Sequence, residues 1–191
     1  MANGEMGNDK KAKGASQGDQ TQGSPPLKLR PIFPHDVEAA TLCGLGAWQS
    51  TIGVCLEAFS HDQFIALQEA FRLYLYSFAS GAVEAGERLI VAESNGAICG
   101  FCGYDDHKGY LSDLWVSPVW QGKGVAQALL HEMRSTMQDQ GRRFLTLEVL
   151  AQNHRAFAFY KKQGFIETKR RVKYDPVLER RLMKIWMMQR L

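Results

Sequence analysis

The part of the sequence best suited to chemistry surrounds two glycines, Gly122 and Gly124. An apolar strand pattern stops at Ser117-Pro118, and a helical pattern begins at about Gly122. The first turn of a helix leaves backbone N–H groups unpaired, and glycine lets an anion approach them closely. The Lys123 ammonium adds positive charge. The segment predicts an anion-binding turn, and the alternative is a helix start that glycine merely loosens.

Glu148 is a second candidate for chemistry. It is an isolated carboxylate in the apolar strand pattern 143–150. An unpaired charge is disfavoured in such a strand unless it meets water or a partner. Glu148 is therefore a candidate site residue, and the alternative is an outward-facing or structurally paired acid. Asp113, in the neighbouring strand pattern 110–116, is the reserve candidate.

Two spaced motifs carry a family resemblance. The anion-binding turn has neither the G-x-x-x-x-G-K-[ST] of nucleotide hydrolases nor the G-x-G-x-x-G of dinucleotide-binding folds. Residues 121–126, Gln-Gly-Lys-Gly-Val-Ala, resemble instead the Q/R-x-x-G-x-G/A signature of the GNAT superfamily of N-acetyltransferases. Residues 153–165 are similar to that superfamily's N-x-x-A-x-x-x-Y-x-x-x-G-F segment. The likeness covers about 27–191 as an order of elements, with its specific residues between Tyr110 and Phe165.

The resemblance implies that acetyl-CoA is the co-substrate. Strands 110–116 and 143–150 would splay apart, with the pantetheine arm in the gap and the pyrophosphate on the N–H groups of 121–127. Asn153 would bind the pantetheine region. The implied cofactor-binding residues are Leu114, Trp115, Val116, Gln121, Gly122, Lys123, Gly124, Val125, Ala126, Gln127, Asn153 and Tyr160.

The resemblance also implies the catalytic roles. Tyr160 would be the general acid that protonates the departing thiolate, and the alternative is that it only packs or binds the cofactor. The spacing of Glu148 to Tyr160 resembles that in ribosomal-protein N-terminal acetyltransferases, where this Glu is the base; Asp113 is the reserve base. The expected function is transfer of acetyl to a primary amine by direct attack in a ternary complex. The acceptor stays open between a protein N-terminus, a lysine and a small-molecule amine, and the alternative function is a non-catalytic CoA-binding regulatory module.

The elements needed to position these residues can be traced along the chain. Two helical patterns lie within 36–78, and others at 122–140 and 153–162. Strand patterns occupy 27–32, 88–93, 97–104, 110–116, 143–150, 165–172 and 183–188. This order predicts an α/β fold with a mixed, mostly antiparallel central sheet of about six or seven strands and helices on both faces, the GNAT or acyl-CoA N-acyltransferase fold. Pro31 confines the first strand to an edge or a strand end, and the helices after Gly122 and Asn153 should cross between neighbouring strands.

Composition limits the alternatives. The chain has 191 residues, 45% of them apolar, which suits one domain, placed at 27–191 after a disordered polar tail at 1–26. The formal charge of +3 is too small to indicate nucleic-acid binding by itself. No apolar run approaches the roughly 20 residues of a membrane span, so a cytoplasmic protein is expected. The sequence leaves the oligomeric state open, a homodimer included.

Four cysteines raise the question of metal or disulfides. They are Cys43, Cys55, Cys99 and Cys102. The Cys99–Cys102 pair has no second such pair and no neighbouring histidine, so it lacks the usual context of a metal or redox motif. Buried free thiols are the preferred interpretation, and no metal site is predicted.

Overall fold

The structure is a computed structural model and describes residues 26–53 and 60–191. Nearly all of the tail predicted at 1–26 lies outside the described residues, as does Cys55. The division into a tail and one domain therefore stays a prediction.

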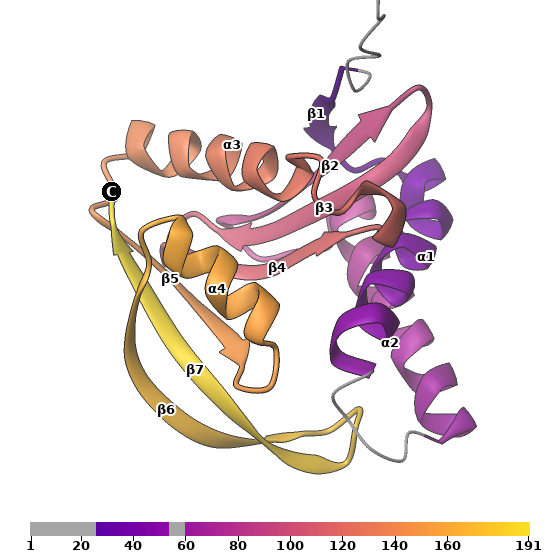
Figure 1. Cartoon of the computed structure of the whole chain (residues 1–191). Coiled ribbons are helices and arrows are strands. Elements are labelled where there is room, and N and C mark those ends of the chain that lie inside the picture. Colours follow the sequence, from indigo (N-terminus) through magenta and orange to yellow (C-terminus); the bar gives the residue numbers. More distant parts are fainter. Residues whose placement is uncertain (1–25, 54–59) are drawn as a thin grey trace, which may run out of the picture.

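A seven-stranded sheet forms the centre of the molecule (Figure 1). Its order is β1-β2-β3-β4-β5-β7-β6, and every neighbouring pair is antiparallel except β4 and β5. The strands are β1 (Lys28–Pro31), β2 (Glu87–Ser94), β3 (Ala97–Asp105), β4 (Tyr110–Val116), β5 (Phe144–Leu150), β6 (Ile166–Asp175) and β7 (Arg180–Arg190). The predicted mixed, mostly antiparallel sheet is confirmed, and the strand that contains Pro31 lies at an edge, where a missing N–H costs no ladder bond.

Helices cover both faces of the sheet. They are α1 (Val37–Trp48), α2 (His61–Ser80), α3 (Val125–Asp139) and α4 (His154–Lys162). One core cluster joins the sheet to α3 and α4 through residues such as Leu129, Met133 and Tyr160. The other joins the opposite face to α1 and α2 through residues such as Leu45, Phe71 and Leu75. The apolar spacing that predicts these helices is therefore the spacing that buries them.

Local signals fix where the helices begin. Ser60 caps α2, because its hydroxyl accepts from the Gln63 N–H at 3.1 Å while the Gln63 side chain accepts from the Ser60 N–H at 3.1 Å. α3 starts at Val125, three residues later than its pattern predicts. Gly122 and Gly124 have φ of +78° and +82°, a backbone conformation that ends the preceding turn instead of starting a helix.

The two parallel strands β4 and β5 separate along their length. Among the described residues they pair only where Tyr110 meets Thr146 and Leu111 meets Leu147. Beyond Leu111 the two strands diverge, and their arrowheads point apart in Figure 1. The sheet is thus open between the ends of its two central strands, as the resemblance implies.

The crossover through α4 differs from the prediction. α3 joins β4 to its neighbour β5, but α4 joins β5 to β6, and β7 lies between these two strands. β7 pairs with β5 from Phe144 to Leu150 and with β6 along nearly its whole length. The last strand of the chain therefore lies between the two strands that α4 connects. No local sequence pattern predicts this strand order.

Three of the four cysteines are described, and all three are free and buried. Burial raises the pKa of the Cys43 thiol to about 12 and raises that of Cys102 as well. No group of three or more His, Cys, Asp or Glu side chains that could hold a metal occurs in the part of the chain that the structure describes. None of its described helices is both long and apolar enough to span a membrane.

Candidate functional site

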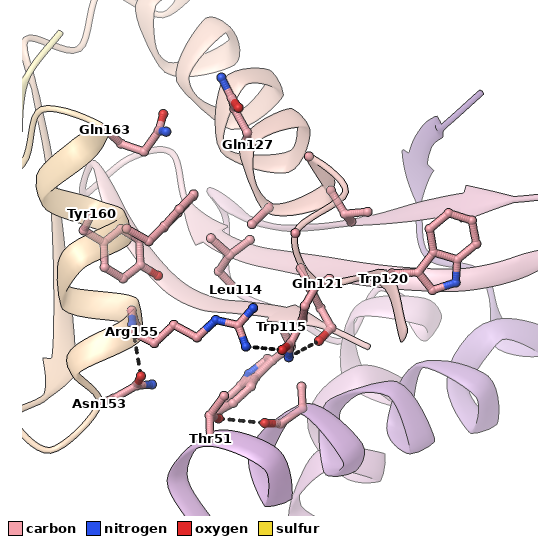
Figure 2. Close-up of a pocket in the computed structure, with 18 of the residues that line it drawn as sticks. Thr51, Leu114, Trp115, Trp120, Gln121, Gln127, Asn153, Arg155, Tyr160 and Gln163 are labelled. Atoms are coloured by element: carbon pink, nitrogen blue, oxygen red, sulfur yellow. Dashed lines mark hydrogen bonds between the residues drawn. The ribbon is translucent and has the colours of Figure 1, made fainter. Parts of the chain in front are cut away.

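A cavity of about 420 Å³ lies at the mouth of the gap between β4 and β5. Its walls come from the end of α1, the end of β4, the start of α3 and one side of α4, as Figure 2 shows. Eleven of the twelve residues predicted to bind the cofactor line it: Leu114, Trp115, Val116, Gln121, Gly122, Gly124, Val125, Ala126, Gln127, Asn153 and Tyr160. Lys123 does not line the cavity; its ammonium lies over the Trp120 ring, 5.0 Å from the centroid.

The start of α3 supplies the main-chain donors of this cavity. The first backbone bond of the helix runs from the Ala128 N–H to the Gly124 carbonyl at 2.9 Å. The N–H groups from Gly124 to Gln127 thus have no backbone acceptor within the described residues, as expected for a helix N-terminus. Two of the amides predicted to bind pyrophosphate are already used, since Gln121 donates to Pro118 and Lys123 donates to Trp120. Of the backbone N–H groups from 121 to 127, those of Gly122 and of 124–127 therefore have no backbone acceptor within the described residues.

The glycines keep this helix end open. A Cβ built on Gly122 or Gly124 would meet no atom within 4 Å, so neither glycine is there to relieve crowding by the protein. Their positive φ values are the structural requirement, because glycine adopts this backbone conformation without strain. Free amides, a helix dipole and open space together suit an anion such as a phosphate.

A polar bridge spans the cavity wall between α4 and β4 (Figure 2). The Arg155 guanidinium donates to the side-chain oxygen of Gln121, and the Gln121 amide donates to the Val116 carbonyl at 3.0 Å. The signature glutamine is thus a side-chain link between the strand end and α4. Arg155 is exposed and places a permanent positive charge at the cavity.

Asn153 and Tyr160 lie on α4, about two helical turns apart. The Asn153 side-chain oxygen caps the helix by accepting from the Ala156 N–H at 3.0 Å. Asn153 also lines the cavity. Figure 2 shows the Tyr160 ring reaching from α4 towards Leu114 on β4. Burial, followed by the nearby Cys102 and Asp113, raises the pKa of the Tyr160 phenol well above its ordinary value, so this phenol keeps its proton at neutral pH.

Glu148 lies outside this cavity, on the sheet face that carries α1 and α2. Its neighbour at alternate spacing, Leu150, packs in the core cluster of those helices. The Glu148 carboxylate accepts from the Lys173 ammonium at 2.7 Å, and its side chain is 13% exposed. Glu148 therefore has a cationic partner, which agrees with the alternative that it is a structurally paired acid. The pair lies beside the strand gap.

Tyr110 connects the two sides of the gap electrostatically. Burial raises its pKa to about 12, and the negative charges of Glu148 and then Asp113 add to this shift. Asp113 and Tyr110 also contribute to the raised pKa of Tyr160. Asp113, the reserve base, accepts from the Trp115 indole N–H at 2.9 Å. Tyr110, which pairs with Thr146 where β4 and β5 are still joined, is therefore within electrostatic reach of both candidate bases.

The cavity also has residues that the sequence interpretation did not include. They are Ala47, Thr51, Trp120, Arg155, Ala156, Phe159, Lys162 and Gln163. Those on α4 follow from helical spacing around Tyr160, which would have been enough to find them. Ala47 and Thr51 come from a segment about 60 residues before β4, and no local signal assigns them to this wall.

Comparison with known proteins agrees with this geometry. A model of the acetyltransferase (GNAT) family matches residues 53–165, which are more than half of the chain. An uncharacterised N-acetyltransferase of Mycobacterium tuberculosis is 34% identical over 91 residues, which are 46% of this chain and 58% of that relative. The chain thus matches little more than half the length of this curated relative.

Two solved structures show the same fold. The PaiA N-acetyltransferase of Thermoplasma acidophilum in complex with coenzyme A has a TM-score of 0.68 at 19% identity, over 87% of this chain and 99% of that one. The ribosomal-protein-S18-alanine N-acetyltransferase of Escherichia coli has a TM-score of 0.61 at 22% identity, over 86% of this chain and 94% of that one. These likenesses concern the fold, whereas the family model covers the turn, the strand gap and α4. The chain belongs to the acetyltransferase (GNAT) family.

Proposed function

We propose that this protein transfers an acetyl group from acetyl-CoA to a primary amine, by direct attack within a ternary complex. One observation carries the proposal. A single cavity contains both the free amides at the start of α3 and the Tyr160 phenol beside the strand gap. An anion site and a proton donor within one cavity suit a phosphorylated thioester.

The residues present fit coenzyme A. The amides of 124–127 suit its diphosphate, and Arg155 and Lys162 add positive charge at the same cavity. A second cavity of about 350 Å³ shares Gly124, Gln127 and Gln163 with the first, so the space continues along α3 towards His131 and Arg134. The apolar walls nearer the gap suit the pantetheine arm. The unpaired edge of β4 beyond Leu111 offers main-chain groups to the pantetheine amides and the thioester carbonyl.

The chemistry assigned to the side chains is acid–base catalysis. The amine nitrogen attacks the thioester carbon, a C–N bond forms and the C–S bond breaks. Tyr160 is the proton donor to the departing sulfur, and its elevated pKa keeps it protonated for that step. The proton lost by the amine passes to Glu148, directly or through water, and Asp113 is the alternative acceptor of that proton.

Lys173 has a positioning role in this scheme. Its ammonium donates to the Glu148 carboxylate at 2.7 Å and so holds that carboxylate in place beside the gap. Glu148 lies on the α1 and α2 face and Tyr160 reaches the gap from the α4 side, so base and acid approach the thioester from opposite sides. This arrangement suits a tetrahedral centre with nucleophile and leaving group on different sides.

The experiment is an acceptor screen by thiol release. Purified protein, acetyl-CoA and a panel of peptides and small amines should release free coenzyme A, detected with a thiol reagent. Binding of coenzyme A without turnover on any acceptor would favour a non-catalytic module, which the same fold permits. Absence of both binding and turnover would refute the proposal.

A further inference from the structure

One face of the strand pair β6–β7 gathers positive charge around a tryptophan. We call it the basic face and define it by Lys169, Arg171 and Lys173 on β6 and by Lys184 and Trp186 on β7. The charged groups of the three β6 residues lie 4.8, 5.2 and 4.4 Å from the centroid of the Trp186 ring. Alternate residues of a strand share one side, so these three side chains form a row on one side of the sheet.

The positive charge of this face is largely uncompensated. Within the described residues, Lys169, Arg171 and Lys184 make no ion pair, and Lys173 alone is paired, with Glu148. Every residue of β6 from Ile166 to Tyr174 is exposed, and the strand lies at the edge of the sheet (Figure 1). Clustered like charges repel one another, so a bound anion would stabilise this face.

The basic face begins at the proposed base. Glu148 on β5 is the direct register partner of Trp186 on β7, and Trp186 is that of Lys169 on β6. Register partners project from the same side of a sheet, so Glu148 and the basic face share one surface. Neighbouring strands are roughly 4.8 Å apart, which places β6 about 10 Å from Glu148. An extended chain covers that distance in about three residues.

We propose that the acceptor is an extended acidic peptide, whose amino-terminal amine reaches Glu148 and whose carboxylates, within its first four residues, contact Lys169 and Arg171. This inference rests on the proposed function and narrows its substrate class. An acidic peptide is proposed because its negative charges complement the positive charge of the basic face. Single-stranded nucleic acid is disfavoured because its binding uses free aromatic faces for base stacking, whereas cations already lie over Trp186.

The first test measures binding alone. Three peptides share an amino-terminal alanine, a length and a carboxy-terminal fluorophore, and carry acidic, neutral or basic residues at positions two to four. Fluorescence anisotropy with the full chain saturated with coenzyme A should show the acidic peptide bound at least about tenfold more tightly than the basic one, with the difference shrinking as salt rises. Equal or weaker binding of the acidic peptide would overturn the inference.

Neighbouring arginines on β6 provide a matched control. Arg171→Ala removes a charge from the basic face, and Lys169→Ala with Arg171→Ala removes two; the double variant should weaken acidic-peptide binding about fivefold to tenfold. Arg170→Ala removes the same charge from the adjacent residue, which pairs with Glu167 and projects to the other side of the strand, and should leave binding within twofold. If Arg170→Ala and Arg171→Ala weaken acidic-peptide binding equally, the peptide does not bind specifically to the basic face.

Thiol release with the same peptides separates the two proposals. Turnover that is equal for all three peptides overturns the acidic acceptor and supports the transferase. Arg171-dependent binding of the acidic peptide without thiol release supports the basic face and contradicts the transferase. Tighter, Arg171-dependent binding of a single-stranded octanucleotide, or turnover of free acidic amino acids as efficient as that of the peptide, would overturn the peptide assignment.

Discussion

The two sides of the gap between β4 and β5 offer different kinds of chemical group to a ligand. The cavity side presents main-chain amides without backbone acceptors at the start of α3, next to Gly122 and Gly124 with their positive φ values. The opposite side presents charged side chains, with Glu148, Lys173 and the basic face on β6 and β7. Where main-chain groups are used, only residues that can adopt the required backbone conformation fit. The site is therefore marked by a sequence motif. Recognition by side chains can change with single substitutions and leaves no such motif.

The largest expected effect is on the main-chain side. Gly124→Glu forces a side chain into the positive-φ region and places a carboxylate at the anion site. Like charges at about 4 Å and an effective dielectric constant near 20 cost about 4 kcal/mol, so coenzyme A should bind roughly 1,000-fold more weakly, measured by calorimetry. Gly141→Glu is the control, because Gly141 has φ of +72° and equal open space at the far end of α3. Loss of affinity in both variants would remove the anion site from the explanation.

The second prediction separates binding from chemistry within the cavity. Tyr160→Phe keeps the ring and removes the proton donor, so kcat should fall about 100-fold while the coenzyme A Kd changes less than about threefold. Tyr104→Phe removes another buried phenol from the same core cluster and should leave kcat nearly unchanged. A Tyr160→Phe enzyme with normal turnover would limit this tyrosine to packing.

A smaller effect is expected on the side-chain side. Glu148→Gln should lower kcat/KM about tenfold and flatten its decline at low pH, because the variant has no carboxylate there to take up a proton. Glu167→Gln, which alters an exposed acid on β6, should retain the full pH profile. If Glu148→Gln keeps its decline at low pH and Asp113→Asn loses it, the base is Asp113.

The smallest expected effect is that of high pH on kcat, which should stay nearly constant. The pKa values of Tyr160 and Tyr110 are raised above the ordinary tyrosine value of about 10, so both phenols stay protonated as the pH increases. The proton donor is therefore present throughout, and kcat measured from pH 7.5 to 9.5 should vary less than about twofold. A decline in this range that Tyr160→Phe abolishes would show that the phenol ionises early.

Much of the fold follows from local pattern. The seven strands and the helices appear where apolar spacing, capping residues and turn glycines predict them, because these signals act within a few residues. α3 begins later than its apolar spacing suggests, since the two positive-φ glycines override it. The position of β7 between β5 and β6 was not predicted, because pairing between strands depends on the packing of the whole sheet and not on local pattern.

The candidate site divides in the same way. The turn, Asn153 and Tyr160 belong to contiguous motifs, and the structure places all of them at one cavity. Arg155 and Phe159 were missed although helical spacing marks them. Thr51 and the Glu148–Lys173 pair have no such signal, because each needs contacts between segments that are distant in the sequence.

The sequence by itself determined that a strand turns through two glycines into a helix with free amides, and that a second helix carries a tyrosine two turns after its cap. These are local properties, set by backbone conformation over a few residues. Only the tertiary structure decided that the two helices share a cavity and that Glu148 meets Lys173 across β7. It also determined that uncompensated charge gathers beside that pair. Strand order and register bring such side chains together, and both depend on the packing of the whole sheet.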